Sequence, residues 1–104
     1  MDKREALEKV SEFIKVVVEE YNPLEIILFG SFARGTQNED SDIDVAVILE
    51  TVEGDLLDKK ARLYKIRRGI DAAIEPLLIE SSTDKSGFLD QIRSYGEILY
   101  TKSA

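Results

Sequence analysis

The chain has 104 residues, a mass of 11.7 kDa and a formal net charge of −7 at pH 7. This length fits a single domain over residues 1–104. A hydrophobic content of 43% with only two prolines favours a compact core over disorder. Because the chain contains no cysteine and no histidine, thiolate and imidazole metal sites are excluded. Any catalysis must therefore use carboxylates, hydroxyls, amines or a bound metal.

Hydropathy along the chain indicates neither a membrane span nor a secretory signal. The longest apolar runs, such as 26–29 and 45–49, are far shorter than the roughly 20 residues that cross a bilayer. The N-terminus lacks a basic start followed by an apolar stretch. We therefore expect a cytoplasmic protein without a membrane partner.

The charged residues are unevenly distributed. Residues 39–58 contain eight acidic side chains and no basic one, whereas residues 59–68 contain six basic side chains and no acidic one. An acidic total argues against sequence-independent binding of duplexes, which requires many phosphate-neutralising cations. We interpret the basic run as a solvated helix face, so a nucleic-acid partner is not expected.

The first half of the chain predicts a helix followed by two strands. Apolar residues from Leu7 to Tyr21 recur at three- and four-residue intervals, and Pro23 ends this helix because it disfavours helical geometry at the residue before it. The branched residues at 25–29 predict a buried strand. After the strand we expect one helical turn at 31–34, a polar loop at 35–41 and a second strand at 43–49.

The second half repeats this alternation of helix and strand. We expect a helix over 55–68 with Leu57, Ala61 and Tyr64 on its apolar face, and a strand over 70–79. Pro76 cannot donate to a sheet ladder, which favours an edge position or a bulge for that strand.

Caps at 81–84, an amphipathic helix ending at Gly96 and a short strand at 97–100 complete the chain. The apolar stripe of that helix comprises Phe88, Leu89, Ile92 and Tyr95. The whole pattern predicts an α/β (α+β) fold with a small mixed β-sheet flanked by helices.

Two aspartates open the strand at 43–49. Alternate residues of a strand face the same side, so Asp42 and Asp44 share one face while Ile43, Val45 and Val47 take the other. Two like charges this close stay ionised only if cations or hydrogen-bond donors compensate them. With oxygen ligands alone, Mg²⁺ or Mn²⁺ is favoured, held together with a substrate phosphate.

The segment before this strand offers the complementary donors. A strand that ends in Gly30-Ser31 leaves backbone N–H groups and a hydroxyl where phosphate oxygens are well accommodated, and Arg34 adds positive charge. Each feature by itself is also typical of an ordinary turn or of exposed polar decoration. Together, phosphate donors and a carboxylate pair on consecutive strands are typical of nucleotidyl or phosphoryl transfer.

Two other motifs fail on inspection. Gly30 and Gly35 have the spacing of a Walker A loop, but Thr36 stands where its lysine is needed. The aspartates at 40–44 resemble the start of an EF-hand loop, but Val45 replaces the required glycine and Thr51 the terminal glutamate.

The ordered pattern over residues 30–44, Gly-Ser, Ala-Arg-Gly, a polar loop and Ser-Asp-x-Asp, resembles the DNA polymerase β-like nucleotidyltransferase superfamily. It is most similar to the small prokaryotic members, the minimal nucleotidyltransferases or MNT/MntA-like proteins. The succession of elements agrees over nearly the whole chain. The resemblance implies a nucleotidyltransferase fold.

The resemblance also implies roles for individual residues. Gly30 and Ser31 would contact the triphosphate, and Arg34 would support the phosphate loop. Asp42 and Asp44 would bind two Mg²⁺ ions (or Mn²⁺), one orienting the triphosphate and the leaving pyrophosphate and the other activating an acceptor hydroxyl.

A third carboxylate normally comes from a neighbouring strand in this family. Glu75 is the candidate, assisting metal binding and removal of the acceptor proton. The commonest family pattern has aspartate here, so Asp71 is a competitor and an impaired catalyst is an open alternative.

These features imply an Mg²⁺-dependent nucleotidyltransferase that moves a nucleoside monophosphate to a hydroxyl. The donor would be ATP, which supplies AMP, or another nucleoside triphosphate. A chain of 104 residues leaves little room for an acceptor site. In small family members the partner is commonly a HEPN-domain toxin, which is neutralised by binding or by adenylylation of its tyrosine, so this chain would be an antitoxin in a toxin–antitoxin system. The alternative is a catalytically inactive module that neutralises a partner by complex formation. A homodimer is expected only as the commonest oligomer.

Overall fold

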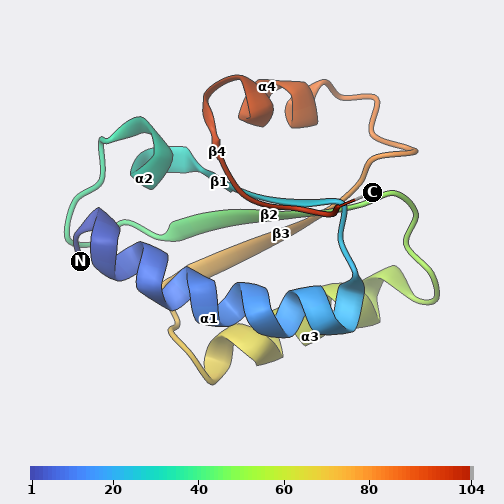
Figure 1. The fold of residues 1–104 in the computed structure, drawn as a ribbon, viewed down its shortest axis with the longest axis horizontal. Helices are drawn as coiled ribbons and strands as arrows, with labels where there is room; N and C mark the ends of the chain where they lie inside the picture. Colours follow the sequence, from blue (N-terminus) through green and yellow to red (C-terminus); the bar gives the residue numbers. More distant parts are fainter. Residues whose placement is uncertain (104) are drawn as a thin grey trace.

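The computed structural model describes residues 1–103 and shows a four-stranded mixed sheet with helices on both faces (Figure 1). The strand order is β3-β2-β1-β4; β1 is antiparallel to β2 and β4, and β2 is parallel to β3. The predicted mixed sheet flanked by helices is thereby confirmed. In chain order the elements are α1 (Lys3–Tyr21), β1 (Glu25–Phe29), α2 (Gly30–Arg34), β2 (Ile43–Leu49), α3 (Leu56–Arg68), β3 (Ile74–Glu80), α4 (Phe88–Tyr95) and β4 (Glu97–Thr101).

Helix α1 begins and ends where its capping residues require. The Asp2 side chain accepts a hydrogen bond from the Glu5 amide, and Asn22 adopts a left-handed conformation (φ 48°) directly before Pro23. The predicted apolar stripe is buried at Val10, Phe13 and Val17. Within residues 1–103, no helix combines the length and the apolar character that crossing a bilayer requires.

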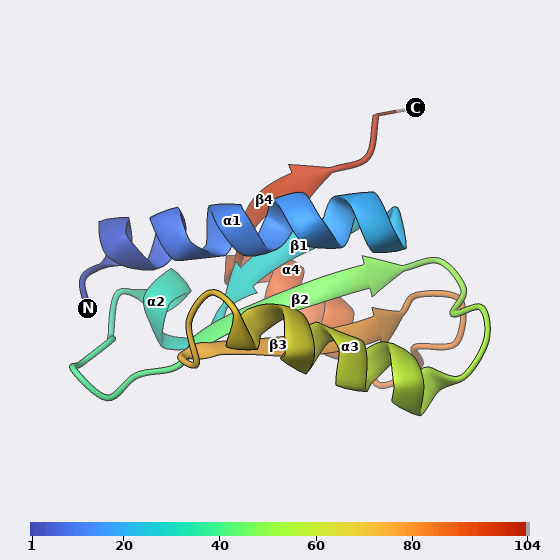
Figure 2. The ribbon, with the colours of Figure 1, turned by 90° about the horizontal axis from the view of Figure 1, so that it is seen from below.

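Successive side chains of β2 point to opposite faces of the sheet and so enter two different apolar layers. Ile43, Val45 and Val47 belong to the layer beneath α1 and α3, which lie side by side on one face of the sheet (Figure 2). Ala46 and Ile48 point the other way, into a smaller layer beneath α4. Asp44 lies two residues before Ala46 and four before Ile48, so its side chain points to the same face of β2 as theirs. The side chain of Asp44 therefore belongs to the α4 face of the sheet.

The predicted apolar face of α3 is wrong. Leu63 and Ile66 are the buried residues, whereas Leu57 is 74% exposed and Ala61 is also exposed. The rotation of α3 is set by contacts with α1. The Tyr21 hydroxyl donates to the Lys59 carbonyl at 2.6 Å, and the guanidinium of Arg62 pairs with Glu20. These contacts turn Leu63 and Ile66 toward the sheet.

Strand β3 begins later than the predicted start at residue 70. Residues 70–73 form a turn instead, in which the Asp71 carboxylate accepts from the Ala73 amide at 2.7 Å and Arg67 donates to the Ala72 carbonyl. The predicted edge position is confirmed, because β3 pairs with β2 alone. Pro76 lies opposite Val45 in that pairing.

The start of α4 also differs from the prediction. Gly87 is the N-cap residue, and no side chain caps the helix from that position. Polar residues in the loop before Gly87 accept hydrogen bonds from the first amides of the helix instead. The Ser86 hydroxyl accepts from the Phe88 amide at 3.1 Å and the Asp84 carboxylate accepts from the Leu89 amide at 3.3 Å. Strand β4 confirms the predicted last strand and extends it by one residue.

Candidate active site

The turn at Gly30-Ser31, here called the phosphate turn, lies directly against Asp44. Phe29, the last residue of β1, is paired with Asp44 in the sheet, so the next residue meets the Asp44 side chain. A Cβ atom built on Gly30 would lie 2.0 Å from Asp44 Oδ2, and Gly30 has a φ of +71°. Both the close approach and the left-handed conformation require glycine here. The turn and the carboxylate therefore form one continuous surface.

The carboxylates of Asp42, Asp44 and Glu75 are electrostatically coupled. Asp44 and Glu75 are partners in the parallel β2–β3 register, and Asp42 stands two residues before Asp44, at an exposed position just outside β2. Burial raises the pKa of Asp44, and the charges of Asp42 and Glu75 raise it further. The side chains around Asp44 therefore leave its negative charge uncompensated, which is the condition that a bound cation relieves.

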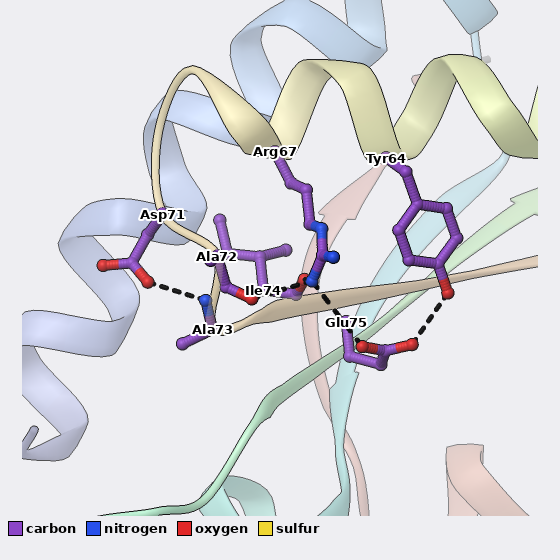
Figure 3. Close-up of polar contacts among 7 residues, drawn as sticks. All are labelled: Tyr64, Arg67, Asp71, Ala72, Ala73, Ile74 and Glu75. Carbon is purple, nitrogen blue, oxygen red and sulfur yellow. Dashed lines mark hydrogen bonds and ion pairs between the residues drawn. The ribbon is translucent and has the colours of Figure 1, made fainter.

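Glu75 is engaged by α3 in this structure (Figure 3). The Tyr64 hydroxyl donates to Glu75 Oε1 at 2.7 Å, and Arg67 Nη1 lies 3.7 Å from Glu75 Oε2. The hydrogen bond to Glu75 raises the pKa of Tyr64. Across residues 1–103, no three acidic side chains are gathered closely enough to hold a metal ion. The carboxylate oxygens of Glu75 instead contact Tyr64 and Arg67 of α3.

Asp71, the competing third carboxylate, is occupied elsewhere. Its Oδ2 lies 2.5 Å from Lys9 Nζ of α1. Its Oδ1 accepts from the Ala73 amide, as Figure 3 shows. The hydrogen bond from Lys9 lowers the pKa of Asp71, and the Ala73 amide lowers it further. Asp71 thus joins α1 to the turn before β3.

Tyr95 is a neighbour of the phosphate turn that sequence reasoning missed. The Gly30 amide donates to the Tyr95 hydroxyl at 3.0 Å, and the guanidinium carbon of Arg34 lies 3.7 Å from the centroid of the Tyr95 ring. From the sequence, Tyr95 was assigned to the apolar stripe of its helix. A tyrosine directly before the helix-ending Gly96 was the one local signal of a special position.

Two cavities in the described structure lie away from this site. One has a volume of about 400 Å³ and is lined by residues that include Val52, Leu78 and Thr83. The other, of about 580 Å³, is lined by residues that include Tyr21 and Lys102. The lining of both excludes the phosphate turn and the three carboxylates.

Comparison with known proteins identifies the family. Residues 10–97 match the model of the nucleotidyltransferase domain. The chain is 36% identical over 75 residues to MJ0141 of Methanocaldococcus jannaschii, covering 68% of this chain and 73% of that protein. It is 30% identical over 94 residues to the protein adenylyltransferase MntA of Shewanella oneidensis, covering 86% of this chain and 63% of MntA. This chain thus spans less than two thirds of the length of MntA.

A solved structure has a similar fold. The crystal structure of a toxin–antitoxin with AMP-PNP superimposes with a TM-score of 0.68 at 26% identity, covering 88% of this chain and 72% of that one. The family match extends from α1 into β4 and includes the phosphate turn, Asp42 and Asp44. On these grounds the chain belongs to the nucleotidyltransferase domain family, as its motif predicts.

Proposed function

We propose that this protein transfers AMP from ATP to a hydroxyl acceptor in a reaction that depends on divalent cations. The observation that carries the proposal is the contact between Gly30 and the uncompensated carboxylate of Asp44. This contact brings the backbone donors of the phosphate turn next to cation-binding oxygens. A nucleoside triphosphate with its cations needs both at the same place.

The residues around Gly30 would bind the phosphate tail. Gly30 would contact the phosphate tail through its backbone, the Ser31 hydroxyl would donate to phosphate oxygens, and the guanidinium of Arg34 would neutralise part of their charge. Ser31 is half-buried and Arg34 is exposed, so both are accessible to a ligand arriving from solvent.

The donor set fits Mg²⁺, with Mn²⁺ as its usual substitute. The three carboxylates would supply oxygen ligands alone, which suits a hard cation that keeps some of its water. Asp42 and Asp44 would hold two ions, and Glu75 would complete the set by exchanging its contacts with Tyr64 and Arg67 for the metal. When bound, the ions neutralise the phosphate charge and lower the pKa of the acceptor hydroxyl.

The acceptor proton would pass to Glu75. Its register position opposite Asp44 places it on the strand next to the carboxylate pair. Asp71 is the poorer candidate, because Lys9 and the Ala73 amide already occupy its two oxygens.

We further propose that the acceptor is a tyrosine hydroxyl on a partner protein. In this arrangement a second protein would supply the acceptor hydroxyl at the site. MntA is a protein adenylyltransferase, and the structure with AMP-PNP is a toxin–antitoxin. By this analogy the partner is a toxin, and the resemblance of the motif to the minimal nucleotidyltransferases makes it one of the HEPN class. The present chain would act in the cytoplasm as its antitoxin.

A transfer assay tests this proposal. The protein is incubated with Mg²⁺, ATP labelled at the α-phosphate and the product of the neighbouring gene. We expect label on a tyrosine of the partner, lost in Asp42→Ala and Asp44→Ala and retained in the control Asp71→Asn. Removal of Mg²⁺ with EDTA should also abolish labelling. Labelling that persists in Asp44→Ala would contradict the proposal.

One observation favours a second function, that of a catalytically inactive binding module. Glu75 is bound by Tyr64 and Arg67, and the carboxylates do not gather around a metal position within residues 1–103. In that case the same mixture would form a tight complex with the partner without transferring label. Both Asp42→Ala and Asp44→Ala would then leave the complex intact.

A further inference from the structure

Tyr95 brings α4 into contact with the phosphate turn. Its hydroxyl accepts a hydrogen bond from the Gly30 amide at 3.0 Å, and its ring lies under the guanidinium of Arg34 at 3.7 Å. These two residues come from the segment that follows β1, more than 60 positions earlier in the chain. One side chain therefore touches two residues, Gly30 and Arg34, that the proposed function places at the triphosphate.

The position of Tyr95 is fixed by packing. Ile92, one turn earlier in α4, is fully buried against the sheet. Gly96 follows Tyr95, and a Cβ atom built there would lie 2.8 Å from Ile27 Cγ2 and 2.9 Å from the Leu28 carbonyl oxygen. The end of α4 thus lies against the backbone of β1, with no space for a side chain between them. Tyr95 is consequently held beside the phosphate turn by the core of the protein.

This arrangement leaves hydrogen-bond donors available to an anion. A phenol can accept one hydrogen bond and donate another, and the Tyr95 oxygen already accepts from Gly30. Within residues 1–103 the hydroxyl hydrogen has no acceptor. Arg34 is exposed. Stacking on the Tyr95 ring restricts the motion of its long side chain, while its N–H groups stay available to a ligand.

We propose that Tyr95 is a phosphate-positioning residue of this nucleotidyltransferase. Its hydroxyl donates to the β- and γ-phosphate part of a nucleoside triphosphate, and its ring holds Arg34 over the same anion. The inference rests on the proposed function, and it adds a residue from α4 to the site. Because the contacts lie at the phosphate turn, they favour a ligand with a long phosphate tail over a nucleoside monophosphate.

Calorimetric binding of two ligands tests the inference. The ligands are α,β-methylene-ATP with Mg²⁺, which cannot transfer AMP, and AMP itself. Tyr95→Phe keeps the stacked ring but removes the hydroxyl, so we expect about tenfold weaker binding of the triphosphate and unchanged binding of AMP. Tyr95→Leu also removes the stack and should weaken the triphosphate further. Tyr100→Phe is the matched control, because Tyr100 lies on β4 and packs against the other apolar layer.

Four results would overturn the inference. Equal binding of the triphosphate by Tyr95→Phe would show that the hydroxyl does not contact the phosphate tail, and tighter binding would show that it competes with the nucleotide for Gly30. Equal losses for AMP and the triphosphate would show a general structural role. A wild-type protein that binds neither ligand would refute the proposed function as well. Thermal unfolding of Tyr95→Phe, which retains the aromatic ring, checks that the fold is intact.

Discussion

Replacement of Gly30 by alanine should separate backbone strain from loss of the site. Gly30 has a φ of +71°, and alanine in that conformation costs about 1–2 kcal/mol. For a chain of this size the strain corresponds to a fall in melting temperature of roughly 4–8 °C per kcal/mol. The new Cβ atom would also lie 2.0 Å from Asp44 Oδ2, well inside van der Waals contact. Since the end of an aspartate side chain can rotate, we expect the Asp44 carboxylate to move away.

Gly35 provides a matched control for that experiment. It has a φ of +76°, and no atom lies within 4 Å of the position that its Cβ would take. Gly35→Ala should therefore carry the same strain without displacing Asp44. We expect similar melting temperatures for Gly30→Ala and Gly35→Ala, but loss of Mn²⁺ binding in Gly30→Ala alone, measured by electron paramagnetic resonance with α,β-methylene-ATP present.

Two outcomes would refute the reasoning. If Gly30→Ala bound Mn²⁺ as tightly as Gly35→Ala, the close approach of the phosphate turn to Asp44 would have no functional consequence. If Gly35→Ala also lost Mn²⁺ binding, backbone strain alone would explain the effect.

Three other substitutions test the electrostatics of the site. Burial and two neighbouring charges raise the pKa of Asp44, so its ionised form destabilises the fold. Asp44→Asn should therefore melt at a higher temperature than the wild type at pH 7 in EDTA. The difference should shrink as the pH falls below the raised pKa and vanish once the pH is below the ordinary aspartate value; a less stable variant at pH 7 would contradict this. The pKa of Asp71 is lowered, chiefly by the hydrogen bond from Lys9, so the ionised Asp71 stabilises the fold. Asp71→Asn should therefore be less stable than the wild type at neutral pH and equally stable once acid protonates the wild-type carboxyl. Its Mn²⁺ binding should be unchanged. Tyr64→Phe frees one oxygen of Glu75 and should tighten Mn²⁺ binding about fivefold, as measured by electron paramagnetic resonance. Weaker binding would show that Tyr64 supports the metal site.

Local sequence pattern was sufficient to predict the strands that carry the site. β1 and β2 begin and end at the predicted residues, because each is a buried run bounded by a proline, a glycine or a polar loop. The face of β2 that holds Asp44 follows from strict alternation. The edge position of β3 follows from Pro76, whose missing N–H restricts it to such a place.

The remaining features depend on contacts between distant residues. The rotation of α3 is set by α1 through Tyr21 and Glu20, roughly 40 positions earlier, so the sparse apolar residues of α3 could not reveal which side is buried. The hydrogen bond from Tyr64 to Glu75 depends on that rotation. The contact of Tyr95 with Gly30 joins residues 65 positions apart, and the helical spacing of Tyr95 is the same as that of a core residue.

The central claim is that Asp42 and Asp44 bind divalent cations together with the phosphate tail of a nucleotide. Mn²⁺ titration of the wild-type protein with α,β-methylene-ATP, followed by electron paramagnetic resonance, tests this most directly. We expect saturable uptake of Mn²⁺ that requires the nucleotide and disappears in folded Asp42→Ala and Asp44→Ala variants. Uptake that is absent in the wild type, or equal in the wild type and both variants, would contradict the claim.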